Sequence, residues 1–241
     1  APGWDLYDYV ISMNENDFQI WKRNGKEVET AVFKYTDVEC IRNREILLYG
    51  KLHIFTKHSS YVFKYNTVSS LIIRKLVRII RDKYSQGKEK VKLPEPELAQ
   101  KNEMDFYFQN LIEKEQADNP DYTFLFCQKR IKLNKLEENI IKRIFFLISA
   151  KELLESIHYS DGIELKITTR GRPFKNLLQS EYGRENIYIP VLKLKKINTN
   201  TVENSAYNEI ELVLNNCTLK FYADINNKAF PAYLKTLRSY L

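Results

Sequence analysis

The stretch that most constrains the fold is Val68–Tyr84, VSSLIIRKLVRIIRDKY, because its apolar residues recur with the period of an α-helix. Such a helix needs an apolar surface to cover, so the residues before it must supply one. The predicted apolar stripe consists of Leu71, Ile72, Leu76, Ile79 and Ile80. The cations Arg74, Arg78 and Arg81 are predicted to share the opposite, solvated face.

The residues before this helix alternate polar and apolar side chains, which is typical of β-strands. Asn24-Gly25 predicts a tight hairpin turn, since both residue types accept positive φ angles. Gly50 is predicted to break the run of strands. The expected strands are Trp4–Ser12, Phe18–Trp21, Glu27–Tyr35, Val38–Ile41, Ile46–Tyr49, Leu52–Thr56 and Tyr61–Tyr65. The first unit is therefore an antiparallel sheet followed by one helix.

The C-terminal half repeats this order of elements. Ile140–Ile148 fits either a strand or a helix, and Ser149–Glu152 fits a helix-capping box. A last helix is expected from Phe230 to Leu241, with Pro231 in its first turn. The expected strands are Tyr122–Phe126, Ile163–Thr168, Asn186–Ile197, Glu209–Leu214 and Cys217–Tyr222.

An acidic, polar stretch separates the two halves. It contains Ser85–Pro96, which carries two prolines, and Glu97–Gln116, which resumes a helical period. We therefore predict a domain at residues 1–85, an acidic linker with a helix at 86–121 and a second domain at 122–241.

The formal net charge of +7 allows nucleic acid, anionic lipid or acidic protein as a partner. Cys40, Cys127 and Cys217 are widely separated, which predicts neither a disulfide framework nor paired metal ligands. A reducing, cytoplasmic setting is expected. No stretch approaches the ~18 apolar residues of a membrane span. Because the chain opens at Ala1 rather than Met, membrane association through a segment absent from this sequence stays open as an alternative.

The antiparallel strands closed by one helix resemble the bacterial members of the pleckstrin-homology-like (PH-like) superfamily. The stretches that carry the resemblance are Tyr9–Ser12, Tyr35–Glu39, Leu52–Thr56, Tyr61–Tyr65 and Leu71–Tyr84. The second half resembles the fold more weakly. The resemblance implies a mainly β, α+β protein of two tandem PH-like barrels or sandwiches, each closed by its C-terminal helix. It also implies a scaffold for binding peptides, protein surfaces or anionic lipid headgroups, and it transfers no catalytic residue.

The most suggestive loop is Thr169–Asn176, TRGRPFKN, because Arg170, Arg172 and Lys175 lie close together in it. Guanidinium groups bind phosphate oxygens in pairs, so the loop is a candidate site for phosphate or acidic lipid. The alternative is an ordinary solvated turn. Its Arg-Gly-Arg-Pro sequence also resembles the core of an AT-hook, which leaves DNA binding as a further alternative.

The basic helix face of Arg74, Arg78 and Arg81 is a second candidate contact surface for an anionic membrane or nucleic acid. A solvated helix face explains the same pattern.

Glu164-Leu165-Lys166, with Asp121 upstream, resembles the Asp…Glu-x-Lys pattern of a nuclease superfamily. In that pattern two carboxylates hold Mg²⁺ and the lysine supports the attacking water. Alternation in a polar strand gives the same Glu-x-Lys pattern without any chemistry.

No phosphate-binding glycine loop, nucleophile elbow or metalloprotease motif occurs, and the three histidines do not have metal-ligand spacing. We therefore predict a non-enzymatic binding or assembly protein with no catalytic residue, metal or cofactor. The expected partner is a protein or an anionic lipid surface. A metal-dependent nuclease and a DNA-binding module are the alternatives.

Overall fold

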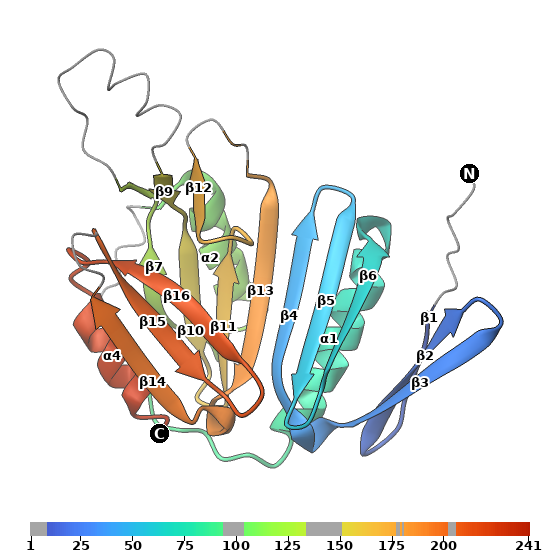
Figure 1. Ribbon diagram of the computed structural model, residues 1–241. Helices are drawn as coiled ribbons and strands as arrows, with labels where there is room; N and C mark the ends of the chain where they lie inside the picture. Colours follow the sequence, from blue (N-terminus) through green and yellow to red (C-terminus); the bar gives the residue numbers. More distant parts are fainter. Residues whose placement is uncertain (1–8, 94–103, 134–150, 177–178, 180, 202–205) are drawn as a thin grey trace.

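The computed structural model describes residues 9–93, 104–133, 151–176, 179, 181–201 and 206–241. Its centre is a seven-stranded sheet in the order β6-β5-β4-β13-β11-β10-β7, with every neighbouring pair antiparallel (Figure 1). The smaller sheets have the orders β1-β2-β3, β12-β9-β8 and β14-β15-β16. The protein is thus mainly β, as predicted. Across the described ranges the central sheet stays open, with β6 and β7 as its edges, and no closed barrel forms.

The N-terminal half consists of two antiparallel meanders followed by a helix. The predicted hairpin at Asn24-Gly25 is confirmed, since Asn24 pairs with Glu27 across the turn and Gly25 has a φ of +67°. Helix α1 lies against the sheet of β4, β5 and β6 and closes a core that includes Phe18, Phe33 and Leu52. The elements are β1 (Tyr9–Met13), β2 (Asp17–Asn24), β3 (Glu27–Lys34), β4 (Val38–Ile46), β5 (Tyr49–Thr56), β6 (Ser60–Asn66) and α1 (Ser70–Ser85).

The C-terminal half has the same order of meanders and final helix. The elements that contribute to the central sheet, with the preceding helix, are α2 (Phe106–Asp118), β7 (Thr123–Gln128), β10 (Ser156–Ser160), β11 (Glu164–Thr169) and β13 (Gly183–Pro190). The second meander and helix are β14 (Lys196–Thr201), β15 (Tyr207–Val213), β16 (Thr218–Asp224) and α4 (Phe230–Arg238). The remaining short strands are β8 (Ile131–Lys132), β9 (Lys151–Leu153) and β12 (Phe174–Asn176).

The second meander packs across one face of the central sheet. Ile187 and Ile189 of β13, Leu212 of β15 and Leu219 of β16 are buried in one apolar core with Leu237 of α4. Helix α2 lies behind the opposite face of the same strands (Figure 1). Both faces of β11 are therefore covered, which explains why all residues from Glu164 to Thr168 are buried.

The two halves share the central sheet through β4 and β13, which pair from Ile41↔Tyr188 to Ile46↔Gly183. Cys40 of β4 and Cys217 of the β15–β16 turn also lie close enough for each thiol to shift the pKa of the other. Because both halves contribute strands to one sheet, the division into domains at residues 1–85 and 122–241 stays a prediction.

The buried face of α1 differs from the predicted stripe. Leu76 and Ile80 are buried as expected, but Leu71, Ile72 and Ile79 are 71%, 69% and 42% exposed. The helix instead buries Ile73, Leu76, Val77, Ile80 and Tyr84. These positions have the i, i+3, i+4, i+7, i+11 spacing of one helical face. The segment has more aliphatic residues than this face can hold, so Leu71, Ile72 and Ile79 remain exposed to solvent.

Several predicted boundaries also change. Val38–Ile46 is one strand, and Gly50 lies inside β5 rather than breaking the run. The predicted strand Asn186–Ile197 ends at Pro190, and a short 3-10 helix, Val191–Lys193, separates β13 from β14. Lys151 and Glu152 belong to β9, so the described part of the predicted helix cap is extended. Ile140–Ile148 lies outside the described residues, as do the first parts of Trp4–Ser12 and Glu97–Gln116.

Candidate binding face and cleft

The three cations of the predicted loop are all paired with carboxylates. The Arg170 Nη2 atom lies 2.8 Å from Asp105 Oδ2, and the Arg172 Nε atom lies 2.5 Å from Glu181 Oε2. Lys175 Nζ lies 3.3 Å from a Glu152 carboxylate oxygen. Arg170 is also stacked over the rings of Tyr107 and Phe108, and its side chain is only 14% exposed. The loop is therefore held by internal charge pairs.

The three cations of α1 fall into three different environments. Arg74 Nη2 lies 3.1 Å from Glu45 Oε2, while Arg78 is 80% exposed and makes only a long contact of 3.9 Å with Asp82. The prediction that Arg81 is solvated is wrong, because Arg81 forms a buried pair with Glu164. Arg74 of the predicted helix face and Arg170 of the predicted loop line the same open hollow beside the start of α1. The structure therefore brings together one residue from each of the two predicted sites.

The nuclease residues are not arranged as a metal site. Glu164 and Lys166 share a face of β11, as predicted, but Arg81, Tyr84 and Tyr122 all donate to the Glu164 carboxylate. Lys166 is paired with Glu115. Asp121 is 76% exposed and lies 3.0 Å from Lys90. Among the described residues, no group of three or more His, Cys, Asp or Glu side chains is placed to hold a metal ion.

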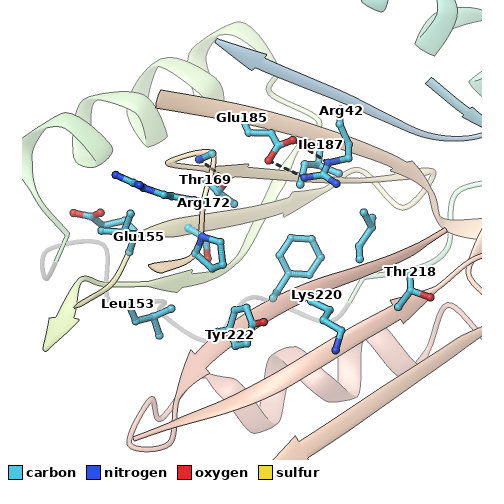
Figure 2. Close-up of a pocket in the computed structure, with 16 residues that line it drawn as sticks. Arg42, Leu153, Glu155, Thr169, Arg172, Glu185, Ile187, Thr218, Lys220 and Tyr222 are labelled. Carbon is cyan, nitrogen blue, oxygen red and sulfur yellow. Dashed lines mark hydrogen bonds and ion pairs between the residues drawn. The ribbon is translucent and has the colours of Figure 1, made fainter. Parts of the chain in front are cut away.

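A cleft of about 280 Å³ lies between the central sheet and β16 (Figure 2). Its apolar wall includes Leu153, Ile187 and Phe221. Arg42 and Glu185 stand together on the sheet side, with Arg42 Nε 2.9 Å from Glu185 Oε1. Sequence reasoning missed this cleft, because it depends on which strands pair across the two halves.

A row of three cations, of which Arg44 is half-buried and Lys51 and Lys64 are exposed, crosses the face of the sheet beside this cleft. Arg44 of β4 is directly opposite Lys51 of β5, and Lys51 is directly opposite Lys64 of β6. Glu185 of β13 is next in the row, opposite Arg44, but its carboxylate is hydrogen-bonded to Arg42. In the part of the chain that the structure describes, no carboxylate pairs with Arg44, Lys51 or Lys64. We call Arg44, Lys51 and Lys64 the cation row.

Two buried nitrogens on this face lack hydrogen-bond partners within the described ranges. They are Nε of Arg44 and Nε2 of His53. Arg44 Nε packs against Gly171, where an added Cβ would lie 3.0 Å from it. Burial and the charges of Lys51 and Arg42 lower the pKa of His53 to about 4. The imidazole is thus neutral at neutral pH, first because burial disfavours its charged form and then because Lys51 and Arg42 add positive potential.

The described helices include none that is long and apolar enough to cross a membrane. Comparisons with models of known protein families and with curated proteins find no match for this sequence.

Proposed function

We propose that the chain is a non-enzymatic recognition module of two PH-like units, and that it binds an anionic lipid surface through the cation row. Each half has antiparallel meanders followed by one helix, an order that supports the resemblance drawn from the sequence. The cation row is the observation that carries the proposal.

The argument from the cation row is energetic. Like charges directly opposite each other on neighbouring strands destabilise a sheet, and Arg44, Lys51 and Lys64 form two such pairs in succession. The cations of the Thr169–Asn176 loop, such as Arg170 and Arg172, are by contrast paired with carboxylates. A row that repels itself is therefore best explained by an anion that binds outside the chain.

Vesicle co-sedimentation tests the proposal. The chain should bind vesicles of phosphatidylcholine mixed with phosphatidylserine and should not bind phosphatidylcholine alone. Each cation near an anionic surface contributes about 1 kcal/mol, so replacing Arg44, Lys51 and Lys64 by Gln should weaken binding by on the order of a hundredfold. Added salt should weaken the binding of the wild-type protein, because it screens these charges.

The matched control replaces three exposed lysines at the other end of the sheet, Lys57, Lys88 and Lys195, by Gln. This variant has the same net charge as the cation-row variant, so non-specific attraction falls equally in both. Equal loss in the two variants, or no vesicle binding by the wild-type protein, would overturn the proposal. Tighter binding to duplex DNA, lost in the cation-row variant, would replace lipid by nucleic acid.

His53 gives a second readout that reports on this face alone. A bound anion offsets the positive potential of Lys51 and Arg42, so the pKa of His53 should rise from about 4 toward its ordinary value. Titration of the His53 ring by NMR, with and without anionic lipid micelles, measures this change.

A further inference from the structure

Five aliphatic side chains stand exposed at one end of the first unit. They come from the β4–β5 turn, from the short 3-10 helix Thr67–Ser69 and from the start of α1, at the upper end of β4 and α1 in Figure 1. Their exposed fractions are 69% for Leu47, 69% for Leu48, 85% for Val68, 71% for Leu71 and 69% for Ile72. We call these five residues the aliphatic tip. Exposed aliphatic residues gathered at one end of a unit are a candidate interaction site.

The aliphatic tip is one surface, because its two segments are bonded together. The backbone N–H of Thr67 donates to the Leu48 carbonyl at 3.1 Å, and the Thr67 hydroxyl donates to the Leu47 carbonyl at 2.8 Å. Leu47, Val68 and Leu71 also line the open hollow that Arg74 and Arg170 border. The turn and the helix start therefore move as one unit.

Leu47 is strained and contributes little to the fold. It is the one non-glycine residue with a positive φ among those described, at +49°. A left-handed conformation costs a branched residue more than it costs Gly or Asn, and an exposed side chain offsets none of that cost by packing. A leucine at this position suits a contact outside the chain.

The cation row lies at one distance from the aliphatic tip. Arg44, Lys51 and Lys64 each lie three residues along their strands from Leu47, Leu48 and Thr67. At about 3.3 Å per residue, these cations are set back from the tip by roughly 10 Å. On the other side of the sheet, Arg74 and Lys75 of α1 are exposed next to Leu71 and Ile72.

We infer that the aliphatic tip inserts among the acyl chains of an anionic bilayer while the cation row contacts the headgroups. This inference rests on the proposed function and adds the depth and orientation of docking. Peripheral apolar faces enter the headgroup–acyl boundary to about 5–10 Å, which matches the set-back of the cations. The five residues of the tip are themselves aliphatic, whereas the centres of protein interfaces are enriched in aromatic residues.

Fluorescence quenching by brominated acyl chains tests insertion directly. Leu71→Trp should be quenched by anionic vesicles that contain brominated lipid, beyond the quenching of the native Trp residues in the wild-type protein. Leu192→Trp is the matched control, because Leu192 is 56% exposed and lies in the 3-10 helix after β13, away from the tip. It should show no added quenching.

Binding measurements give the second test. Each of Leu48→Ser and Leu71→Ser should weaken binding to anionic vesicles about tenfold, as expected for removing one buried leucine. Leu192→Ser should leave binding unchanged. Leu47→Asn should raise the Tm, since Asn accepts this φ, and should still weaken vesicle binding. A change that stabilises the fold and weakens binding separates the tip from a structural role.

The outcomes distinguish the inference from the proposed function. Salt-sensitive binding without added quenching of Leu71→Trp, and with unchanged affinity of the Ser variants, overturns insertion and leaves the cation row as the contact. Absence of vesicle binding overturns both. A dimer in sedimentation velocity that Leu48→Ser dissociates would assign the tip to a second copy of the chain and overturn insertion.

Discussion

Arg81 of α1 and Glu164 of β11 form a buried ion pair that joins the two halves, with Arg81 Nη2 2.7 Å from Glu164 Oε1. The Glu164 carboxylate also accepts from the Tyr122 hydroxyl at 2.5 Å and from Tyr84. The Arg81 guanidinium lies over the Tyr188 ring, 4.3 Å from its centroid. The residue pattern that resembled a nuclease motif therefore contains a structural carboxylate.

Removing one partner of this pair should destabilise the whole molecule. Arg81→Ala leaves the Glu164 charge buried without its guanidinium partner, a change that typically costs about 3–5 kcal/mol. The free energy of unfolding in urea should fall by that order. Arg81→Met with Glu164→Leu should recover much of the loss, because neither buried charge then remains. A similar loss in the double variant would show that the ion pair is not the cause.

Acid should destabilise the protein through His158. Burial lowers the pKa of this histidine to about 3, and its ring is hydrogen-bonded to Ser156 and Tyr233. Below the ordinary pKa of about 6.5, His158 binds a proton in the unfolded chain but stays neutral in the folded chain. The free energy of unfolding therefore falls as the pH falls from 6.5 toward 3. Urea unfolding at a series of pH values measures the slope. His158→Gln should be less stable at neutral pH and should show a shallower acid slope.

The thiols of Cys40 and Cys217 should form a disulfide under mild oxidation. The neighbouring Cys40 thiol lowers the pKa of Cys217, whereas burial raises the pKa of Cys40. Diamide would accept two electrons and two protons as the sulfur–sulfur bond forms, and peptide mass mapping would identify the crosslink. The bond would tie β4 to the β15–β16 turn and raise the Tm. Cys217→Ser should abolish both effects, and a crosslink to Cys127 instead would contradict the prediction.

A side chain at Gly50 should destabilise the fold, because the ring of Tyr65 covers this position. A Cβ on Gly50 would lie 2.2 Å from the Tyr65 ring, and moving the ring would break the Tyr65–Asn43 hydrogen bond of 2.7 Å. Gly50→Ala should cost about 1–3 kcal/mol of unfolding free energy, typical of overpacking. In a Tyr65→Leu background the same substitution should cost less. Equal costs in the two backgrounds would exclude the ring as the cause.

Local patterns predicted most elements of the fold. Asn24-Gly25 indicated its hairpin from two residues alone, and the strands that became β5, β6, β15 and β16 followed from alternation and turns. The orientation of α1 was harder, because the segment has more aliphatic residues than one face can bury. The buried face has regular helical spacing from Ile73 to Tyr84, and the pair of Arg81 with Glu164, which lies far away in the sequence, favours the same orientation.

The candidate site depended on pairing between strands distant in sequence. Nothing near Arg44 indicates that Lys51 and Lys64 will stand beside it in a row, since this depends on the register of three strands. The ion pairs of Arg170 and Arg172 could not be read from the loop for a similar reason. Their carboxylate partners, Asp105 and Glu181, come from other segments.

The pairing of β4 with β13 also bears on how this chain avoids aggregation. Each strand would be an unprotected sheet edge if its half stood alone, with a row of free backbone donors and acceptors. Each half therefore covers the strand edge of the other, and this pairing forms only after residues of β4 and β13, far apart in the chain, have come together. A fragment that ends after α1 should self-associate through β4, because proteolytic separation of the halves would leave that strand as an exposed sheet edge.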